Sequence, residues 1–271
     1  MSSTQKNATR KPPEKRGERL ESLERGLRVL ELFGQGSARN FAMIEIADQL
    51  RITRASTLRI LATLEAIGYV RLDGRTYSLT PRVLALGYSY LASLGFRTVA
   101  RPILEDMVRH TRETCSIGVL DGTDVVYVAR EESRRLIRID LSVGSRLPAH
   151  LNSMGRVLLA ALPDADLNLY IKMIKLEKLT KRSIVDRREL KLRILETRAL
   201  GYCYIDGEVD DRIAGLATPV RNRNGATIAA LNLSLGFGRH DRAQAEEIFL
   251  PLLRKASQQI ESIVQNDISV N

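Results

Sequence analysis

The side chains best suited to bind a polyanion are the arginines that recur between positions 39 and 75. The guanidinium group is a planar fork of N–H donors, which fits a phosphate or the edge of a base better than the point charge of lysine does. Small hydroxyl side chains lie among these arginines and can donate to the same acceptors. The candidate contact residues are Arg39, Arg51, Arg54, Ser56, Thr57, Arg59, Arg71 and Arg75.

The elements that position these residues are predicted from hydrophobic spacing. Apolar residues at helical spacing predict helices over 22–33, 43–50 and 54–67, the last one ending at Gly68. The second and third helices are separated by about three residues, which is the spacing of a helix-turn-helix. Alternating residues on both sides of Asp73-Gly74 predict a hairpin with a type I′ turn. Residues 21–80 therefore read as a winged helix-turn-helix.

This arrangement predicts contact with double-stranded DNA. The N-terminal part of the second helix of the motif enters the major groove, where arginine can read guanine and hydroxyl groups can reach phosphates or bases. Arg71 and Arg75 lie on the wing, which can meet phosphates or the minor groove. Two alternatives stay open: Thr57 could face the core, and some arginines could be surface charges paired with Glu45, Asp48, Glu65 or Asp73.

The charge distribution agrees with this interpretation. The chain has 271 residues and a net charge of +10. Residues 1–98 contain 16 basic and 9 acidic side chains, whereas residues 99–271 contain 26 and 23. The excess, which includes a polar tail over 1–20 expected to be disordered, is concentrated in the first third. The preference for arginine, 33 against 9 lysines, could also reflect codon bias.

Several classes of protein are disfavoured. No GxSxG, GxxxxGK[ST] or HExxH motif is present, and the three histidines are isolated, so we expect no enzyme activity, metal or cofactor. The alternative is an enzyme or metabolite-binding protein with an accessory DNA-binding domain. Two cysteines make no disulfide framework and fit a cytoplasmic protein. No apolar run is long enough to span a membrane and no signal peptide is visible, so we expect no membrane partner.

The remainder of the chain predicts a linker and a second domain. Residues 81–98 read as a helix that is apolar nearly all round, which one small domain cannot cover, so we expect it to pack against a second subunit. Residues 99–265 combine paired strands with intervening helices and lack strict βαβ alternation. This pattern predicts an α+β fold around a mainly antiparallel sheet.

A second anion-binding feature lies near position 153. Asn152 or Ser153 is a predicted N-cap, and Gly155 leaves the amides of the first helical turn approachable. These amides and the positive end of the helix dipole attract a carboxylate, and Arg156 adds charge nearby. The alternative is an ordinary capped helix with Arg156 pointing outward.

Several stretches of the chain resemble the IclR family of bacterial transcriptional regulators over residues 22–264. They are SLERGL at 22–27, ATLEAIGYV at 62–70, LTPRVLALGY at 79–88, LDGTDVVYVAR at 120–130, VGSRLPAH at 143–150 and SMGRVLLA at 153–160. The last two are similar to the branch that includes the PcaR, PcaU and PobR regulators of aromatic-acid and β-ketoadipate breakdown.

The resemblance implies a GAF-like effector-binding domain over 99–265 and a homodimer or dimer of dimers on a palindromic operator. RNA polymerase is a further partner that it allows. The implied effector is a small organic acid, such as protocatechuate, 4-hydroxybenzoate or β-ketoadipate, with a non-aromatic acid as the alternative. Activation and repression remain equally open.

The resemblance also implies an effector pocket. Asn232 and Ser234 are two residues apart on a predicted strand and share a face, as do Asp206 and Glu208. Gly215 stands where many members of the family carry Cys or Ser, and His150-Leu151-Asn152 also departs from the pattern of the aromatic-acid branch. The candidate pocket residues are Ile139, Leu141, Asn152, Ser153, Met154, Gly155, Arg156, Asp206, Leu216, Asn232 and Ser234.

Overall fold

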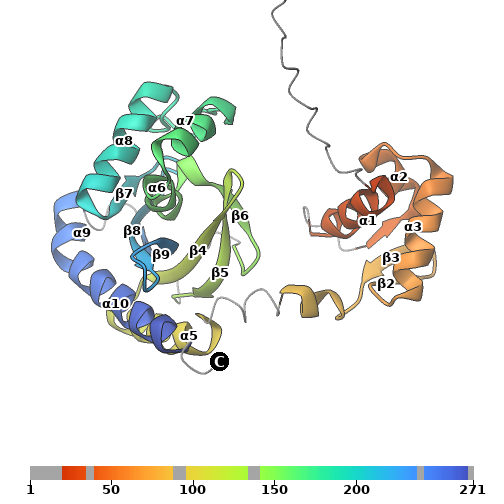
Figure 1. Cartoon of the computed structure of the whole chain (residues 1–271), viewed down its shortest axis with the longest axis horizontal. Coiled ribbons are helices and arrows are strands. Elements are labelled where there is room, and N and C mark those ends of the chain that lie inside the picture. The colour runs from red at the N-terminus through yellow and green to blue at the C-terminus, as the bar shows by residue number, and fades with distance from the viewer. Residues whose placement is uncertain (1–19, 35–39, 88–95, 134–140, 237–240, 268–271) are drawn as a thin grey trace, which may run out of the picture. The chain divides into compact units, whose positions relative to one another are not determined.

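The computed structural model describes residues 20–34, 40–87, 96–133, 141–236 and 241–267. The chain divides into two compact units, residues 1–88 and 89–271, each of which is described by itself (Figure 1). The predicted linker helix over 81–98 falls at this junction. Residues 83–87 are helical, residues 88–95 lie outside the described part, and the next helix begins at Phe96.

The first unit packs three helices on a small antiparallel sheet. Its elements are α1 (Glu21–Leu32), β1 (Asn40–Ala42), α2 (Met43–Leu50), α3 (Arg54–Ala66), β2 (Val70–Asp73) and β3 (Thr76–Leu79). The strand order is β1-β3-β2. One buried cluster, which includes Val29, Ile46, Leu61 and Tyr77, joins all three helices to the strands. The predicted winged helix-turn-helix is confirmed; β1 is additional, because three residues are too few to show alternation.

The turn of the wing differs from the predicted type. Asp73 pairs with Thr76, so the two loop residues are Gly74 and Arg75. Gly74 has a φ of 62°, whereas Arg75 has no positive φ. A glycine at the first of two loop positions is typical of a type II′ turn, and the predicted type I′ turn is therefore wrong. Arg75 lies at the tip of the wing.

The second unit is built on one six-stranded sheet. Its elements are α5 (Phe96–Thr111), β4 (Thr114–Asp121), β5 (Asp124–Glu131), β6 (Arg146–Pro148), the 3-10 helix η1 (Ala149–Leu151), α6 (Ser153–Ala160), α7 (Asp164–Met173), α8 (Arg187–Leu200), β7 (Cys203–Asp206), β8 (Ile213–Arg221), β9 (Thr227–Gly236), α9 (Arg242–Ile248) and α10 (Leu250–Asp267). The order is β6-β5-β4-β9-β8-β7, and every neighbouring pair is antiparallel. The predicted α+β architecture is confirmed.

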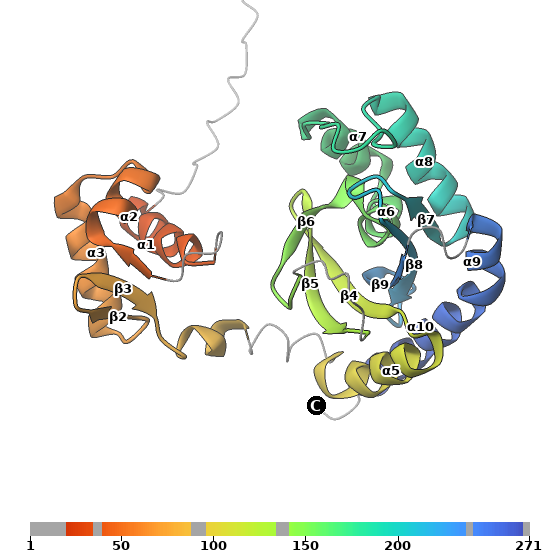
Figure 2. The ribbon, with the colours of Figure 1, turned by 180° about the vertical axis from the view of Figure 1, so that it is seen from behind.

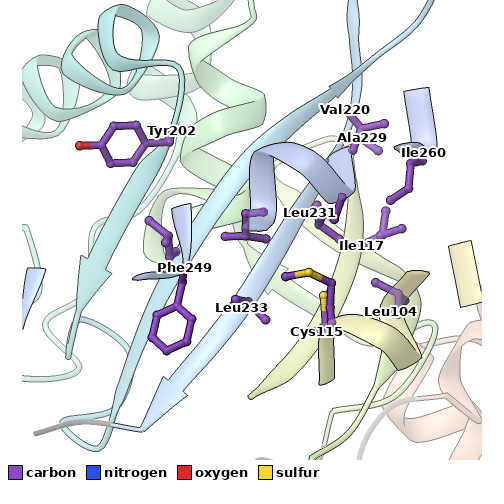
Figure 3. Packing of buried hydrophobic residues seen from close by; sticks show 14 of the residues in the cluster. Leu104, Cys115, Ile117, Tyr202, Val220, Ala229, Leu231, Leu233, Phe249 and Ile260 are labelled. Atoms are coloured by element: carbon purple, nitrogen blue, oxygen red, sulfur yellow. The ribbon is translucent and has the colours of Figure 1, made fainter. Parts of the chain in front are cut away.

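Helices cover both faces of this sheet, as the two opposite views show (Figures 1 and 2). Helices α5 and α10 lie against one face, where Leu104 and Ile260 pack with Ile117, Leu231 and Leu233 of the strands (Figure 3). Helix α6 lies against the other face and joins α7 and α8 in a second buried cluster. None of the described helices is both long and apolar enough to cross a membrane.

Strand alternation decides which side chains face α6. In β9, Leu231 and Leu233 belong to the cluster under α5 and α10. Because successive side chains of a strand point to opposite faces, Asn232 and Ser234 face α6. Leu216 of β8 also belongs to the cluster under α5 and α10, so it points away from α6.

Helix α6 is buried along its whole length. The Asn152 side chain caps it by accepting from the Gly155 amide at 2.8 Å. Gly155 lets η1 fold closely over this first turn, because a Cβ at this position would lie 1.9 Å from the Ala149 carbonyl oxygen. The absence of a side chain at Gly155 therefore fixes the position of the α6 N-terminus.

We expect Gly155→Ala to lower the free energy of unfolding of the second unit by about 3 kcal/mol, because backbone and not a flexible side chain must yield. Urea denaturation measures this difference. Gly26→Ala is the matched control, since it lies in α1 with nothing within 4 Å of its added Cβ. The control should leave stability unchanged or raise it by up to about 1 kcal/mol. Equal unfolding midpoints for Gly155→Ala and the wild type would contradict the close contact.

Candidate functional site

The turn between α2 and α3 presents a short, well-capped helix start. Arg51 is the C-cap of α2 and has a left-handed backbone conformation, with a φ of 53°. Thr53 caps α3 through its hydroxyl, which accepts from the Ser56 amide at 3.2 Å. Arg54 and Arg59 are exposed and Ser56 is partly exposed on α3. These are the positions from which a recognition helix contacts DNA.

Thr57 does not share this exposure. Its side chain is fully buried, and its hydroxyl donates to the Thr53 carbonyl oxygen at 3.1 Å. The expectation that Thr57 contacts DNA is therefore corrected, since it supports the helix start from inside the core.

The wing adds two exposed arginines. Arg71 lies on β2 and donates from Nε to the Ser78 hydroxyl at 3.1 Å, while Arg75 occupies the turn. Among the residues that the structure describes, none of Arg51, Arg54, Arg59, Arg71 and Arg75 forms an ion pair. Their charges are therefore available to an external anion. Arg39 lies outside the described residues.

A second candidate site is a pocket in the second unit, on the α6 face of the sheet. Its volume is about 70 Å³, which is room for roughly five water molecules and restricts a ligand to a small molecule. The lining residues are Tyr127, Leu141, Leu147, Leu151, Asn152, Ser153, Met154, Ile205, Glu208, Val209, Asp210, Ile213, Ala214, Gly215, Asn232 and Ser234.

The N-terminus of α6 supplies hydrogen-bond donors to this pocket. The amides of Ser153 and Met154 have no acceptor within the helix, because no helical turn precedes them. The Asn152 side chain accepts from the Gly155 amide and from neither of these two. The Ser153 side chain is 3% exposed, and its hydroxyl accepts from Asn232 Nδ2 at 3.0 Å. Among the described contacts its own hydrogen has no acceptor. A carboxylate in the pocket would accept from these groups.

Strand β9 completes the polar wall. Asn232 Nδ2 also donates to the Leu233 carbonyl oxygen at 3.0 Å, and the Ser234 hydroxyl donates to Asn232 Oδ1 at 3.2 Å. Gly215 of β8 keeps this wall open, because a Cβ there would lie 2.7 Å from the Ser153 hydroxyl oxygen. A Cys or Ser at this position would compete with Ser153 for the same space.

The structure brings six of the predicted pocket residues together: Leu141, Asn152, Ser153, Met154, Asn232 and Ser234. Ile139 lies outside the described residues. Three others do not line the pocket. Leu216 points to the opposite face, Gly155 packs on Ala149, and Asp206 accepts from Arg182 at 2.6 Å in a separate groove beside α8.

Arg156 is the remaining correction. It is 3% exposed, lines the groove beside α8, and donates from Nη2 to Glu208 and from Nε to the His150 carbonyl oxygen. It points neither outward nor into the pocket, and its charge is matched by Glu208. Burial and the Arg156 charge lower the pKa of His150 to about 4, so His150 is neutral near pH 7.

The predicted pocket residues include none from the loop that follows β7, although Glu208 was expected to share a face with Asp206. Glu208 lines both the pocket and the groove beside α8, and Asp210 lines the pocket. The alternation that placed Asp206 and Glu208 on one face does not apply, because β7 ends at Asp206 and Gly207 follows with a φ of 65°. The apolar walls Leu147, Leu151 and Ile213 come from segments whose closeness depends on the folded sheet. Among the described residues no cluster of His, Cys, Asp and Glu could hold a metal ion.

The buried Arg156–Glu208 pair generates a pH-dependent prediction. Burial raises the pKa of the Glu208 carboxyl, and the neighbouring Arg156 opposes that rise. Arg156→Met leaves Glu208 buried without its cation, so we expect the free energy of unfolding to fall by about 3–5 kcal/mol near pH 8. The pKa of Glu208 in the folded variant then rises further above its unfolded value. The variant therefore loses stability as the pH rises from the unfolded to the folded pKa of Glu208. Its loss of unfolding free energy relative to the wild type should be smaller near pH 5 than near pH 8.

Urea denaturation at both pH values measures this deficit. The double variant Arg156→Met/Glu208→Gln is the control, because it removes the unpaired charge as well. It should regain part of the stability near pH 8 and lose the added pH dependence. A deficit of the same size at both pH values would show that the charge of Glu208 is not its cause.

Comparison with known proteins places both units in one family. Residues 22–74 match the family described as "IclR helix-turn-helix domain" and residues 88–262 match "Bacterial transcriptional regulator IclR C-terminal". The Pca regulon regulatory protein of Pseudomonas putida is 40% identical over 242 residues, which cover 89% of this chain and 83% of that protein. The p-hydroxybenzoate hydroxylase transcriptional activator of Acinetobacter baylyi is 34% identical over 90% of this chain and 92% of its own length.

The fold comparison agrees. An IclR homolog from Microbacterium hydrocarbonoxydans, crystallised with 4-hydroxybenzoate, superposes with a TM-score of 0.78 over 90% of this chain and 98% of that one, at 24% identity. Both the sequence matches and the architecture extend across the winged helix-turn-helix and the α/β unit. The chain belongs to the IclR family of bacterial transcriptional regulators.

Proposed function

We propose that this regulator binds a palindromic operator as a homodimer or a dimer of dimers, through α3 and the wing. The observation that carries this proposal is that Arg51, Arg54, Arg59, Arg71 and Arg75 are exposed and make no ion pair within the described part of the chain. When such arginines neutralise phosphates, the counterions condensed on the DNA are released, and this release favours binding. Ser56 adds a hydroxyl near the start of the recognition helix. The protein would act in the cytoplasm as a regulator and not as an enzyme, with RNA polymerase as a further partner.

We expect Arg59→Ala and Arg75→Ala each to weaken operator binding. Each lost phosphate contact should flatten the slope of log K against log salt by about 0.9. Fluorescence anisotropy with a promoter fragment, over a range of salt concentrations, measures affinity and slope together. Arg28→Ala is the matched control, because Arg28 is an exposed arginine of the same unit on α1. If both variants kept the wild-type affinity and slope, α3 and the wing would not be the contact surface.

For the second unit we propose that the α6-face pocket binds a small carboxylic acid of aromatic catabolism as effector. The support is the set of donors at one wall, which are the amides of Ser153 and Met154 and the Ser153 hydroxyl; Asn232 holds this hydroxyl in place by donating to its oxygen. The relatives named above regulate Pca and p-hydroxybenzoate genes, and the superposed homolog holds 4-hydroxybenzoate. An effector changes operator binding only by its differential affinity for the conformations of the regulator.

We expect Ser153→Ala and Asn232→Ala to weaken binding of the acid about tenfold or more. Ser153→Ala removes a hydrogen-bond donor, and Asn232→Ala removes the side chain that orients the Ser153 hydroxyl. Isothermal titration calorimetry with 4-hydroxybenzoate, protocatechuate and β-ketoadipate measures the affinities. Ser257→Ala is the control, since this buried serine lies on the other face, where its hydroxyl is 2.8 Å from that of Thr218. An affinity that is unchanged in the two pocket variants, or no heat with any acid, would place the effector elsewhere.

A further inference from the structure

The outward face of α3 carries a restricted set of side chains. The buried residues of this helix are Thr57, Leu61 and Leu64. Positions three or four apart share a face of a helix, and the face away from the buried side is exposed at 55, 58, 59 and 62. The side chains there are Ala55, Leu58, Arg59 and Ala62, with Arg54 exposed at the first position of the helix. Apart from the arginines, this face is therefore aliphatic.

This set limits which bases α3 can distinguish. In the major groove, adenine is read by Asn or Gln and cytosine by Asp or Glu, whereas arginine reads guanine. Helix α3 contains no Asn, Gln or Asp, and its single acid, Glu65, is the second residue from its end. The remaining mark of a base pair is the 5-methyl group of thymine, which apolar side chains contact. The outward face of α3 therefore offers arginines for guanine and aliphatic groups for thymine.

Leu58 is the largest aliphatic side chain on this face. Its neighbours one turn away, Ala55 and Ala62, end at Cβ. Leu58 is 53% exposed, and among the described residues it neither belongs to the buried cluster of the first unit nor packs against it. A single exposed leucine is ordinary on a protein surface. This one, however, lies in the middle of the face that we propose enters the DNA, so its methyl groups are available to a base.

The charges around Leu58 favour DNA as the partner over a second copy of the chain. Arg54 lies one turn before Leu58 and Arg59 is the next residue, and both are exposed. Two copies that met through this face would bring these like charges together, which costs free energy. DNA instead places phosphates near the guanidinium groups and base edges, with the thymine methyl groups, against the leucine.

We infer that Leu58 is a specificity-determining residue, which contacts a thymine methyl group in the major groove of each operator half-site. The half-site then contains this thymine together with the guanines that Arg54 or Arg59 reads. The inference rests on the proposed DNA contact through α3 and specifies which base that contact selects. It adds an uncharged residue to a surface that is otherwise defined by its arginines.

A promoter fragment in which deoxyuridine replaces every thymidine tests this inference, because it lacks only the 5-methyl groups and keeps the same base pairing. Fluorescence anisotropy with the full chain compares it with the normal fragment. The wild type should bind the deoxyuridine fragment about fourfold more weakly for each methyl group that is buried. Leu58→Ala should bind the normal fragment more weakly than the wild type does, and should bind the two fragments with affinities that differ by less than about twofold.

The dependence on salt separates this contact from a phosphate contact. Leu58→Ala should leave the slope of log K against log salt unchanged, because no phosphate loses a cation. Leu23→Ala is the matched control, since Leu23 is a leucine of the same unit that is 59% exposed on α1. This control should keep the wild-type ratio between the two fragments.

Equal affinity of the wild type for the two fragments overturns the inference, as does an equal loss on removal of the methyl groups in the wild type and in Leu58→Ala. If Arg59→Ala and Arg75→Ala still weaken binding and flatten the salt slope in that case, the proposed contact surface stands and only the assignment of Leu58 is wrong. If these two variants keep the wild-type affinity and slope, the proposed surface fails and the inference fails with it.

Discussion

The second unit depends on one constraint, which is that α6 is buried along its entire length between the sheet and the helices α7 and α8. A buried helix must satisfy its polar groups inside the protein. Asn152 takes one orphan amide, Gly155 lets η1 approach, and Arg156 donates to the His150 carbonyl oxygen and to Glu208. The amides of Ser153 and Met154 are the ones that this arrangement leaves without an acceptor within the helix.

The same constraint explains why Arg156 is not the cation of the pocket. A charge this deeply buried needs a partner of opposite sign, and Glu208 supplies it. The pair therefore joins α6 to the loop after β7, and Arg156 is not among the residues that line the pocket. In the proposed recognition of an acid, helix amides and hydroxyl groups, which are neutral donors, take the place of this guanidinium group.

In the first unit the corresponding constraint is that the arginines of α3 and the wing must stay exposed at the surface. The core of α1, α2, α3 and the wing uses apolar side chains, and Thr57 joins it through a hydrogen bond within α3. The arginines of α3 and the wing, with Arg51, stay at the surface without acidic partners in the described part of the chain, whereas Arg25 of α1 pairs with Glu21. Positive charges on α3 and the wing that no carboxylate compensates attract a polyanion. This electrostatic imbalance connects the composition of the chain with its class of function.

The sequence by itself determined the elements and the family. Periodicity located the three helices and the hairpin of the first unit. In the second unit, the alternation of side chains along a strand correctly predicted that Asn232 and Ser234 share a face. It could not determine the turn type of the wing, since that depends on which residues pair across the hairpin. It also could not show that Leu216 faces α5 and α10, that Thr57 is buried, or that Glu208 replaces Asp206 at the pocket. Those outcomes depend on contacts between residues far apart in the chain, and only the tertiary structure brings α6, β8, β9 and the loop after β7 around one small cavity.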